Sequence, residues 1–332
     1  MKHANVALFV PHNGCPHQCS FCSQRTITGR QEQPAPEDVV KAAEIAEKSL
    51  GAETQNAEIA FFGGSFTAID RAYMVSLLEA AYPFVKSGRF KGIRVSTRPD
   101  YIDVEVLSVL KKYGVTTIEL GAQSMDDRVL GLNGRGHTSK QVEDASKLIS
   151  AEGFTLGLQM MTGLYGDTAA GAVMTAQKLA GLKPQNVRIY PTIILRSTEL
   201  GERYLKGEYK TLSLDETVGL CARLLDFFES RGIEVIRLGL HASRQLERDM
   251  LSGPWHPAFG ELCESRRFFN KVMAYTALNG VPKGKLTVAV NPKDISVAKG
   301  QKKSNIQKFY DNGYNVVIKT DKSVKQKSFT VV

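Results

Sequence analysis

Residues 5–22 read NVALFVPHNGCPHQCSFC, an apolar run followed closely by three cysteines in the spacing C-x3-C-x2-C. The run Asn5–Val10 has the length and composition of a buried strand. Cys15, Cys19 and Cys22 then fall in the loop after that strand. In a β/α barrel, the loop after a strand lies on the face where active sites are built, so these cysteines are candidates for chemistry.

Further apolar runs of strand length alternate with amphipathic helical stretches along the chain. The expected strands are Asn5–Val10, Glu58–Phe62, Ile93–Thr97, Thr116–Leu120, Thr155–Met161, Asn186–Tyr190 and Glu234–Leu238. The expected helices are Pro36–Leu50, Arg71–Phe84, Asp103–Tyr113, Ser139–Glu152, Ala169–Leu182 and Leu214–Arg231. Repeated strand–helix units predict a parallel α/β sheet, and six or seven units favour a full or partial TIM-like (β/α) barrel. No G-x-G-x-x-G dinucleotide fingerprint follows any of these strands.

The pattern changes after about residue 240, and we expect three parts. These are a core barrel over 1–240, a helical connection over 241–282 and a small basic α/β module over 283–332. The module is expected to contain strands Leu286–Val290, Val316–Lys319 and Ser328–Val332, with a helix at Ser304–Tyr310. At 332 residues the chain has the length of about two domains, or of one barrel with an appendage.

Composition narrows the class of protein and charge suggests a partner. Hydrophobic residues make up 42% and charged residues 23%, which excludes a disordered or collagen-like chain. No apolar run approaches a membrane span, and the first is too short for a signal segment, so a cytoplasmic location without a membrane partner is expected. Residues 281–332 carry eleven lysines and three aspartates, which suggests a polyanionic partner such as RNA. A solubilising lysine face is the alternative.

The clustered cysteines indicate a metal site rather than a disulfide framework. Three thiolates can hold three irons of a [4Fe–4S] cluster and leave the fourth iron open for a ligand. The alternative is a structural zinc with His12 or His17 as fourth ligand, although no second C-x2-C pair is present. Cys221 is expected to be a core residue, and Cys263 either a core or a second redox residue.

With Phe21 before the third cysteine, this spacing resembles the signature of the radical S-adenosylmethionine (SAM) superfamily. Phe61–Thr67, which contains Gly63-Gly64-Ser65, resembles the glycine-pair motif of that family. A further series resembles, in the same order, the radical SAM half of the catalytic subunit of Elongator and its shorter bacterial relatives. It consists of Ser96–Asp100, Glu119–Ser124, Asn133–Thr138, Met160-Met161, Leu182-Lys183 and Ile189–Thr192. The resemblance covers roughly residues 5–240 and implies the partial barrel of that superfamily.

The resemblance implies roles residue by residue. The three cysteines would ligate the cluster, Phe21 would lie near the adenine of SAM, and Gly63, Gly64 and Ser65 would hold its methionine part. Arg135 and Gln123 would reach the carboxylate and ribose of SAM, and Gln159 would make a polar ribose contact. The alternatives are a helix cap for Gln123, a surface salt bridge for Arg135 and a buried amide for Gln159. Candidates for substrate-side catalysis are Glu119, Tyr190 and His137, with Tyr190 alternatively a barrel-lining residue.

The chain departs from the Elongator pattern in three ways. Elongator has a longer gap between its first two cysteines, and it has Glu where this chain has Ser96. It also carries an acetyltransferase domain after the radical SAM core, whereas only about 90 residues follow residue 240 here, without an acyl-CoA loop motif. The acetyl-CoA-dependent chemistry of Elongator is therefore not expected to transfer.

The resemblance implies an iron–sulfur enzyme that takes an electron from a donor such as ferredoxin or flavodoxin. It would cleave SAM reductively to methionine and a 5′-deoxyadenosyl radical. RNA, above all tRNA, is the expected substrate, with Lys302, Lys303, Lys308, Phe309 and Tyr310 as contacts. The alternatives are a small-molecule or porphyrin-type precursor, and a non-catalytic, zinc-stabilised RNA-binding protein.

Overall fold

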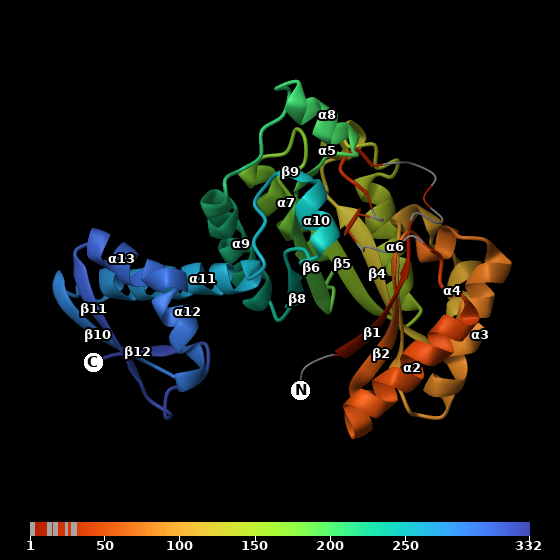
Figure 1. Ribbon diagram of the computed structural model, residues 1–332, viewed down its shortest axis with the longest axis horizontal. Coiled ribbons are helices and arrows are strands. Elements are labelled where there is room, and N and C mark those ends of the chain that lie inside the picture. The colour runs from red at the N-terminus through yellow and green to blue at the C-terminus, as the bar shows by residue number, and fades with distance from the viewer. Residues whose placement is uncertain (1–3, 12–14, 16–18, 24–25, 28–31) are drawn as a thin grey trace. The chain divides into compact units, whose positions relative to one another are not determined.

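The structure is a computed structural model that describes residues 4–332 except 12–14, 16–18, 24–25 and 28–31 (Figure 1). Contacts between Cα atoms divide it into two compact units, Met1–Leu212 with Phe228–Pro254, and Ser213–Phe227 with Trp255–Val332. The three-part division expected from the sequence stays a prediction. No helix among the described residues has the length and apolar content needed to span a bilayer.

The first unit is built on one curved sheet of seven parallel strands in the order β1-β2-β3-β4-β5-β6-β8. This confirms the α/β partial-barrel prediction, and every expected strand of the core is present. The strands are β1 (Ala4–Val10), β2 (Ala57–Gly63), β3 (Gly92–Thr97), β4 (Val115–Gln123), β5 (Thr155–Thr162), β6 (Asn186–Pro191) and β8 (Glu234–Leu238).

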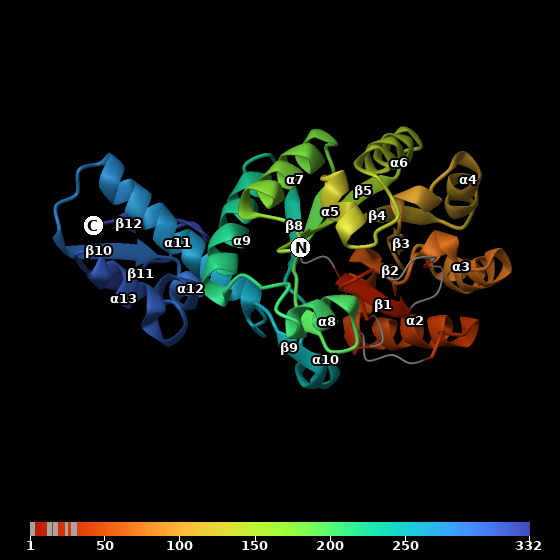
Figure 2. The same cartoon turned by 90° about the horizontal axis from the view of Figure 1, so that it is seen from above.

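Helices follow most strands and cover the outer side of the curved sheet, as Figure 2 shows for α2, α3, α4, α6 and α7. The helices of this unit are α2 (Pro36–Leu50), α3 (Arg71–Lys86), α4 (Val104–Lys112), α5 (Asp127–Leu132), α6 (Ser139–Ala151), α7 (Ala169–Gly181), α8 (Glu199–Leu205) and α10 (Arg244–Asp249), with 3₁₀ turns at Gly51–Asn56, Phe66–Ala68 and Pro99–Tyr101. Side chains fix where several begin: Asp103 accepts from the Val106 amide, and Thr138 forms a capping box with Gln141.

A short antiparallel pair, β7 (Ile194–Leu195) with β9 (Met250–Ser252), was not predicted from the sequence. Two and three residues carry too little alternation to be recognised as strands. The pair joins the segment after β6 to the segment after β8, and Ile194 packs with Leu200 and Tyr209 in a small buried cluster.

The two faces of the seven-stranded sheet differ in chemistry. Alternate residues such as Ile59, Phe61 and Ile118 are fully buried and apolar, as a face covered by helices requires. The other face carries buried charged residues, among them Glu58, Arg94, Glu119 and Arg188. Because the strands are parallel, their carboxyl ends meet at one edge of the sheet, where loops from several strands can contribute to one site.

The second unit contains most of α9 (Leu214–Glu229) and the C-terminal residues. Its elements are α11 (Phe259–Leu278), β10 (Gly284–Val290), α12 (Ile295–Lys299), α13 (Ser304–Asp311), β11 (Tyr314–Thr320) and β12 (Phe329–Val331), with 3₁₀ turns at Pro292–Asp294 and Gln301–Lys303. The sheet order is β11-β10-β12, with β11 parallel and β12 antiparallel to β10. Phe268, Val288 and Phe309 lie in its core, so the small α/β appendage expected from the sequence is confirmed.

Candidate active site

The cysteine loop follows β1 and is anchored to the loop after α5. Cys15 is exposed, Cys19 buried and Cys22 partly buried. The Cys22 amide donates to the Cys19 carbonyl at 3.0 Å, which forms a turn between the second and third cysteines. Between them, the Ser20 amide donates to the Asn133 carbonyl at 3.1 Å and the Ser20 hydroxyl to Asn133 Oδ1 at 3.0 Å. These bonds hold the cysteine loop against the segment that contains Arg135.

The Gly63-Gly64-Ser65 turn at the end of β2 packs directly on the end of β1. The Gly64 amide donates to the Val10 carbonyl at 2.7 Å. Gly63 has φ +111°, and a Cβ there would lie 2.9 Å from the same carbonyl oxygen, so no other residue fits without a shift. The backbone of Ser65 hydrogen-bonds to the Cys15 thiol, which places this turn beside the first cysteine.

Arg135 joins the cysteine loop to β4. Its Nη1 donates to Cys19 Sγ at 3.1 Å, and its Nη2 donates to the Gly121 carbonyl at 2.6 Å. Arg98, from the end of β3, donates through Nη2 to the Arg135 carbonyl at 2.6 Å and forms a two-bond pair with Asp100. Arg135 is 7% exposed, and its Nε has no partner among the described residues, so this guanidinium keeps an unused buried donor.

Gln123 ends β4 in a left-handed conformation, with φ +64°. The pairing of β4 with β5 shifts between Gly121 and Gln123, and the Gln123 amide lies over Gly121, where a Cβ would be 2.9 Å from its Nε2. The Gln123 Oε1 is buried and has no partner among the described residues. A strained backbone and an unused acceptor, next to the unused donor of Arg135, are typical of a ligand site.

His137 lies behind Arg135 and is 4% exposed. Burial, together with the charges of Arg135 and Arg98, lowers the pKa of His137 to about 4. Its Nε2 lies 3.3 Å from the Ala122 carbonyl, whereas Nδ1 has no partner among the described residues. The imidazole is therefore neutral at pH 7 and cannot act there as a proton donor in its cationic form.

The pKa of the Cys15 thiol is subject to opposing influences. Burial and the neighbouring Cys19 raise the pKa of Cys15, while the Ser65 backbone and the charges of Arg98 and Arg135 lower it. The net effect is a raised pKa of Cys15, which the two guanidinium groups oppose by favouring the thiolate, the form that binds metals. Among the described residues, no three His, Cys, Asp or Glu side chains are gathered as metal ligands, and the alternative ligands His12 and His17 lie outside the described residues.

Glu119 lies deep on the inner face and is held between two arginines. Arg94 Nη1 donates to its Oε1, Arg188 Nη2 donates to Oε1 at 2.9 Å, and Arg188 Nε donates to Oε2 at 2.7 Å. Gln159 Nε2 adds a bond to Oε2 at 2.9 Å. Although burial opposes ionisation, Arg188 and Arg94 hold the pKa of Glu119 below its usual value, so the carboxylate is ionised and its oxygens are fully engaged.

Tyr190 lies two strands from Glu119, at the end of β6. Its hydroxyl hydrogen-bonds to Arg188, and burial raises its pKa. The phenol therefore remains protonated at neutral pH and is half-buried, unlike Glu119. Phe21 packs against the Ile194, Leu200 and Tyr209 cluster.

The structure thus brings several predicted residues together and separates others. One connected set of contacts lies at the carboxyl ends of the strands. It contains Cys15, Cys19, Gly63, Gly64, Ser65, Gln123, Arg135 and His137. Gln159, Glu119 and Tyr190 belong instead to the charged network of the inner face. The two other cysteines, Cys221 and Cys263, are buried on α9 and α11 and hydrogen-bond to each other, which raises the pKa of Cys263.

Sequence reasoning missed the arginines that organise both regions, Arg94, Arg98 and Arg188. The signal for Arg98 was available, because it stands in the quoted Ser96–Asp100 motif directly after a strand. Arg94 and Arg188 lie within strands, and their alternation with apolar residues indicates an inward face but not a partner.

Comparison with known proteins gives a consistent assignment. The family model described as the radical SAM superfamily matches residues 9–179, and the model of the radical SAM C-terminal domain matches residues 184–267. The chain is 27% identical over 254 residues to the tRNA uridine(34) acetyltransferase of Methanocaldococcus jannaschii, covering 65% of this chain and 47% of that protein. It is 32% identical over 200 residues to human Elongator complex protein 3, covering 54% of this chain and 36% of that protein.

The fold has solved counterparts. The archaeal Elp3 of Methanocaldococcus infernus, with its N-terminus deleted, superposes with a TM-score of 0.61 at 21% identity, covering 85% of this chain and 64% of the other. This likeness concerns the fold. The chain spans less than half the length of the two sequence relatives described above, so their activities as whole proteins do not pass to it directly.

Proposed function

Because the chain belongs to the radical SAM superfamily, we propose that it binds a [4Fe–4S] cluster and SAM and uses them to modify RNA, above all tRNA. The observation that carries the first part is the contact of Arg135 with Cys19, 3.1 Å from Nη1 to Sγ, beside the unused polar atoms of Arg135 and Gln123. The cysteine loop is therefore in direct contact with a buried group whose polar atoms are not all used by the protein.

The residues present fit this pair of cofactors. Cys15, Cys19 and Cys22 supply three sulfur donors, the set that leaves a fourth iron without a protein ligand. Gly63 and Gly64 carry no side chains that would keep a ligand away, so the backbone of this turn would be able to lie close to the methionine part of SAM. The free Nε of Arg135 is suited to a carboxylate, and the free Oε1 of Gln123 to a ribose hydroxyl.

The other two contacts with SAM, from Phe21 and Gln159, are proposed from the positions of these residues. Phe21 precedes Cys22 in the cysteine loop and would border the adenine. Gln159 donates to Glu119 and Ser96, so a ribose contact from its amide would use the carbonyl oxygen.

When bound, the two cofactors supply one-electron cleavage of SAM to a 5′-deoxyadenosyl radical, with the electron taken from a donor such as ferredoxin or flavodoxin. The chain's own residues orient and shield. Tyr190 offers a protonated hydroxyl held by Arg188 and is the proposed substrate-side donor. Glu119 would act by fixing the position of the Arg188 guanidinium. Neutral His137 would support the position of Arg135.

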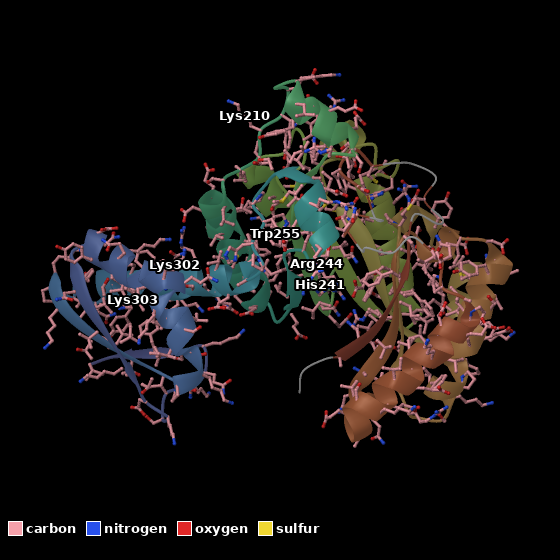
Figure 3. All side chains as sticks on the ribbon, viewed as in Figure 1. Lys210, His241, Arg244, Trp255, Lys302 and Lys303 are labelled. Atoms are coloured by element: carbon pink, nitrogen blue, oxygen red, sulfur yellow. The ribbon has the colours of Figure 1, made fainter. Side chains whose placement is uncertain are left out.

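The proposed RNA substrate rests on relatives and on charge. One relative is named for its action on tRNA uridine 34, and the C-terminal unit carries most of the chain's excess positive charge. Figure 3 shows Lys302 and Lys303 on the segment between α12 and α13, where both are exposed and neither forms an ion pair with another described residue. These two lysines are therefore available to phosphates.

The other proposed contacts differ in availability. Lys308 lies 3.5 Å from Asp215, so part of its charge is already paired. Phe309 is completely buried in the core of the unit, so the expectation that it stacks on a base was wrong. Phe309 lies on the side of α13 that packs against β10 and β11. Tyr310, the next residue, is 69% exposed and remains suited to stacking on a base.

Binding of unmodified tRNA at several salt concentrations tests the RNA part. We expect the Lys302→Gln/Lys303→Gln variant to bind more weakly and to lower the slope of log K against log salt by about 1 to 2, as loss of two phosphate contacts requires. Lys41→Gln/Lys48→Gln on α2, of equal net charge, is the control. Absence of tRNA affinity at low salt would remove the RNA proposal and favour a small-molecule substrate.

A further inference from the structure

Among the described residues, the inner face of the sheet sets three arginines beside two buried carboxylates. Glu58 and Glu119 are the buried carboxylates of this face, and Arg94 bridges them. Arg188 forms the second ion pair of Glu119, with 2.7 Å between Nε and Oε2. Arg237 of β8 is the third arginine, and no carboxylate among the described residues is set against it.

A change of register places Arg237 beside Arg188. The pairing of β6 with β8 runs from Val187 with Val235 to Arg188 with Arg237, so one residue of β8 is skipped. Without this shift Ile236 would stand opposite Arg188. Irregularities of this kind re-aim side chains and are common beside functional sites. Here the shift puts two guanidinium groups next to each other, which is unfavourable unless something anionic joins them.

Two further polar groups complete this arrangement, which we name the cationic cluster: Arg188, Tyr190, Arg237 and His241. The positive charges of Arg237 and Arg188 both favour lower pKa values for the Tyr190 hydroxyl and for His241. Arg237 Nε donates to the Gly239 carbonyl at 2.9 Å, which orients the rest of the guanidinium. Arg188 lies over the Phe62 ring, 4.9 Å from its centroid, and is held by Glu119.

The exposure of the cluster increases toward the carboxyl ends of the strands. Arg188 is buried, Tyr190 and Arg237 are half-buried, and His241 is exposed on the segment that joins β8 to α10, where Figure 3 labels it with Arg244. A ligand that enters from the carboxyl-end edge would therefore meet His241 first and the fixed guanidinium groups next. This is the edge at which β1, β2 and β4 present the cysteine loop, the Gly63–Ser65 turn and Gln123.

We propose that the cationic cluster binds a phosphate group of the substrate and thereby positions the substrate at the carboxyl-end edge. Guanidinium groups suit phosphate because several N–H donors can reach two oxygens at once, and a phenol and an imidazole add further donors. The inference rests on the proposed function in one respect: in an RNA substrate, this phosphate belongs to the backbone beside the modified nucleotide.

Isothermal titration with inorganic phosphate, uridine 5′-monophosphate and uridine tests the proposal on the full-length reconstituted protein. We expect phosphate and the monophosphate to bind and uridine to bind much more weakly. Arg237→Gln should weaken phosphate and monophosphate binding by about tenfold or more, the usual effect of a lost charged hydrogen bond. Arg223→Gln, an exposed arginine on α9, has the same change of charge and should leave binding unchanged.

A second readout separates binding from a structural role. Because Arg237 has no carboxylate partner, Arg237→Gln should leave the unfolding midpoint without phosphate unchanged or higher, and phosphate should raise the wild-type midpoint only. Equal phosphate affinity in wild type and variant would overturn the proposal, as would equal loss of SAM affinity, which would assign the cluster to the cofactor. Absence of deoxyadenosine release from the wild-type protein with SAM and dithionite would mark failure of the proposed function, separately from failure of this proposal.

Discussion

Two polar regions of the same sheet differ in how completely their buried atoms are paired. On the inner face, Glu119 accepts bonds from Arg94, Arg188 and Gln159, and all of its capacity is used by the protein. At the carboxyl ends, Arg135 and Gln123 are equally buried, yet each keeps a polar atom without a partner among the described residues. Both regions are charged or polar, so polarity alone does not distinguish them.

This difference in pairing distinguishes residues that stabilise the fold from residues that bind a ligand. A paired buried charge network stabilises one arrangement of the strands and has nothing left to offer a ligand. A buried donor or acceptor without a partner costs free energy, so it is retained where a ligand completes it. On this basis we propose that Glu119 is a positioning residue, whereas Arg135, Gln123 and Arg237 face ligands.

The largest loss of stability is expected on the inner face, where the buried charges of Glu119 and its arginines are fully paired. Glu119→Gln removes the charge that compensates both Arg94 and Arg188, and we expect it to lower the free energy of unfolding by about 3 to 5 kcal/mol. Urea denaturation measures this loss. Glu105→Gln is the control, since Glu105 is 82% exposed in its pair with Arg71 and should cost far less. A similar small loss in both variants would break the distinction between the two regions.

His137 gives a pH-dependent test of the second region. Its pKa is about 4 in the folded protein against 6.5 as its ordinary value, so the unfolded chain binds the extra proton between these values. Stability should therefore fall as the pH falls from 6.5 toward 4, with a contribution from His137 that reaches roughly 3 kcal/mol near pH 4. The difference in unfolding free energy between wild type and His137→Gln, measured across this range, isolates the contribution. A difference independent of pH would refute it.

A smaller but more specific effect is expected at Arg135. Arg135→Gln should weaken SAM binding to the reconstituted protein by about tenfold, which corresponds to about 1.4 kcal/mol, because one charged donor to the carboxylate is lost. Equilibrium dialysis with labelled SAM measures the affinity. Arg128→Gln serves as the matched control, because Arg128 is an exposed arginine bonded to the Gly166 carbonyl. Equal affinities in the two variants would mean that the free Nε does not face SAM.

The sequence predicts the elements of this fold well and their side-chain partners poorly. The helix Pro36–Leu50 has the observed bounds, because a proline and two acidic residues mark its start and a glycine follows its end. Strand periodicity identifies Glu119 as inward-facing, but its partners Arg94 and Arg188 lie 25 and 69 residues away. Only the folded sheet brings such residues together.

Backbone irregularities were also beyond sequence reasoning. The left-handed Gln123 and the register shift before Arg237 break the alternation that strand prediction assumes, and both are at proposed ligand sites. The cysteines and the glycine pair could be recognised because their motifs are local, and their chemistry depends on residue type and spacing.

Radical SAM chemistry at the cysteine loop is tested by measuring bound iron and released deoxyadenosine on the same protein. Anaerobically reconstituted protein is assayed for iron and sulfide per chain and, with SAM and dithionite, for 5′-deoxyadenosine, with Cys19→Ala in parallel. We expect about four irons per chain and deoxyadenosine that disappears in the variant. Zinc in place of iron, with no deoxyadenosine under reducing conditions, would contradict it and assign the cysteines a structural role.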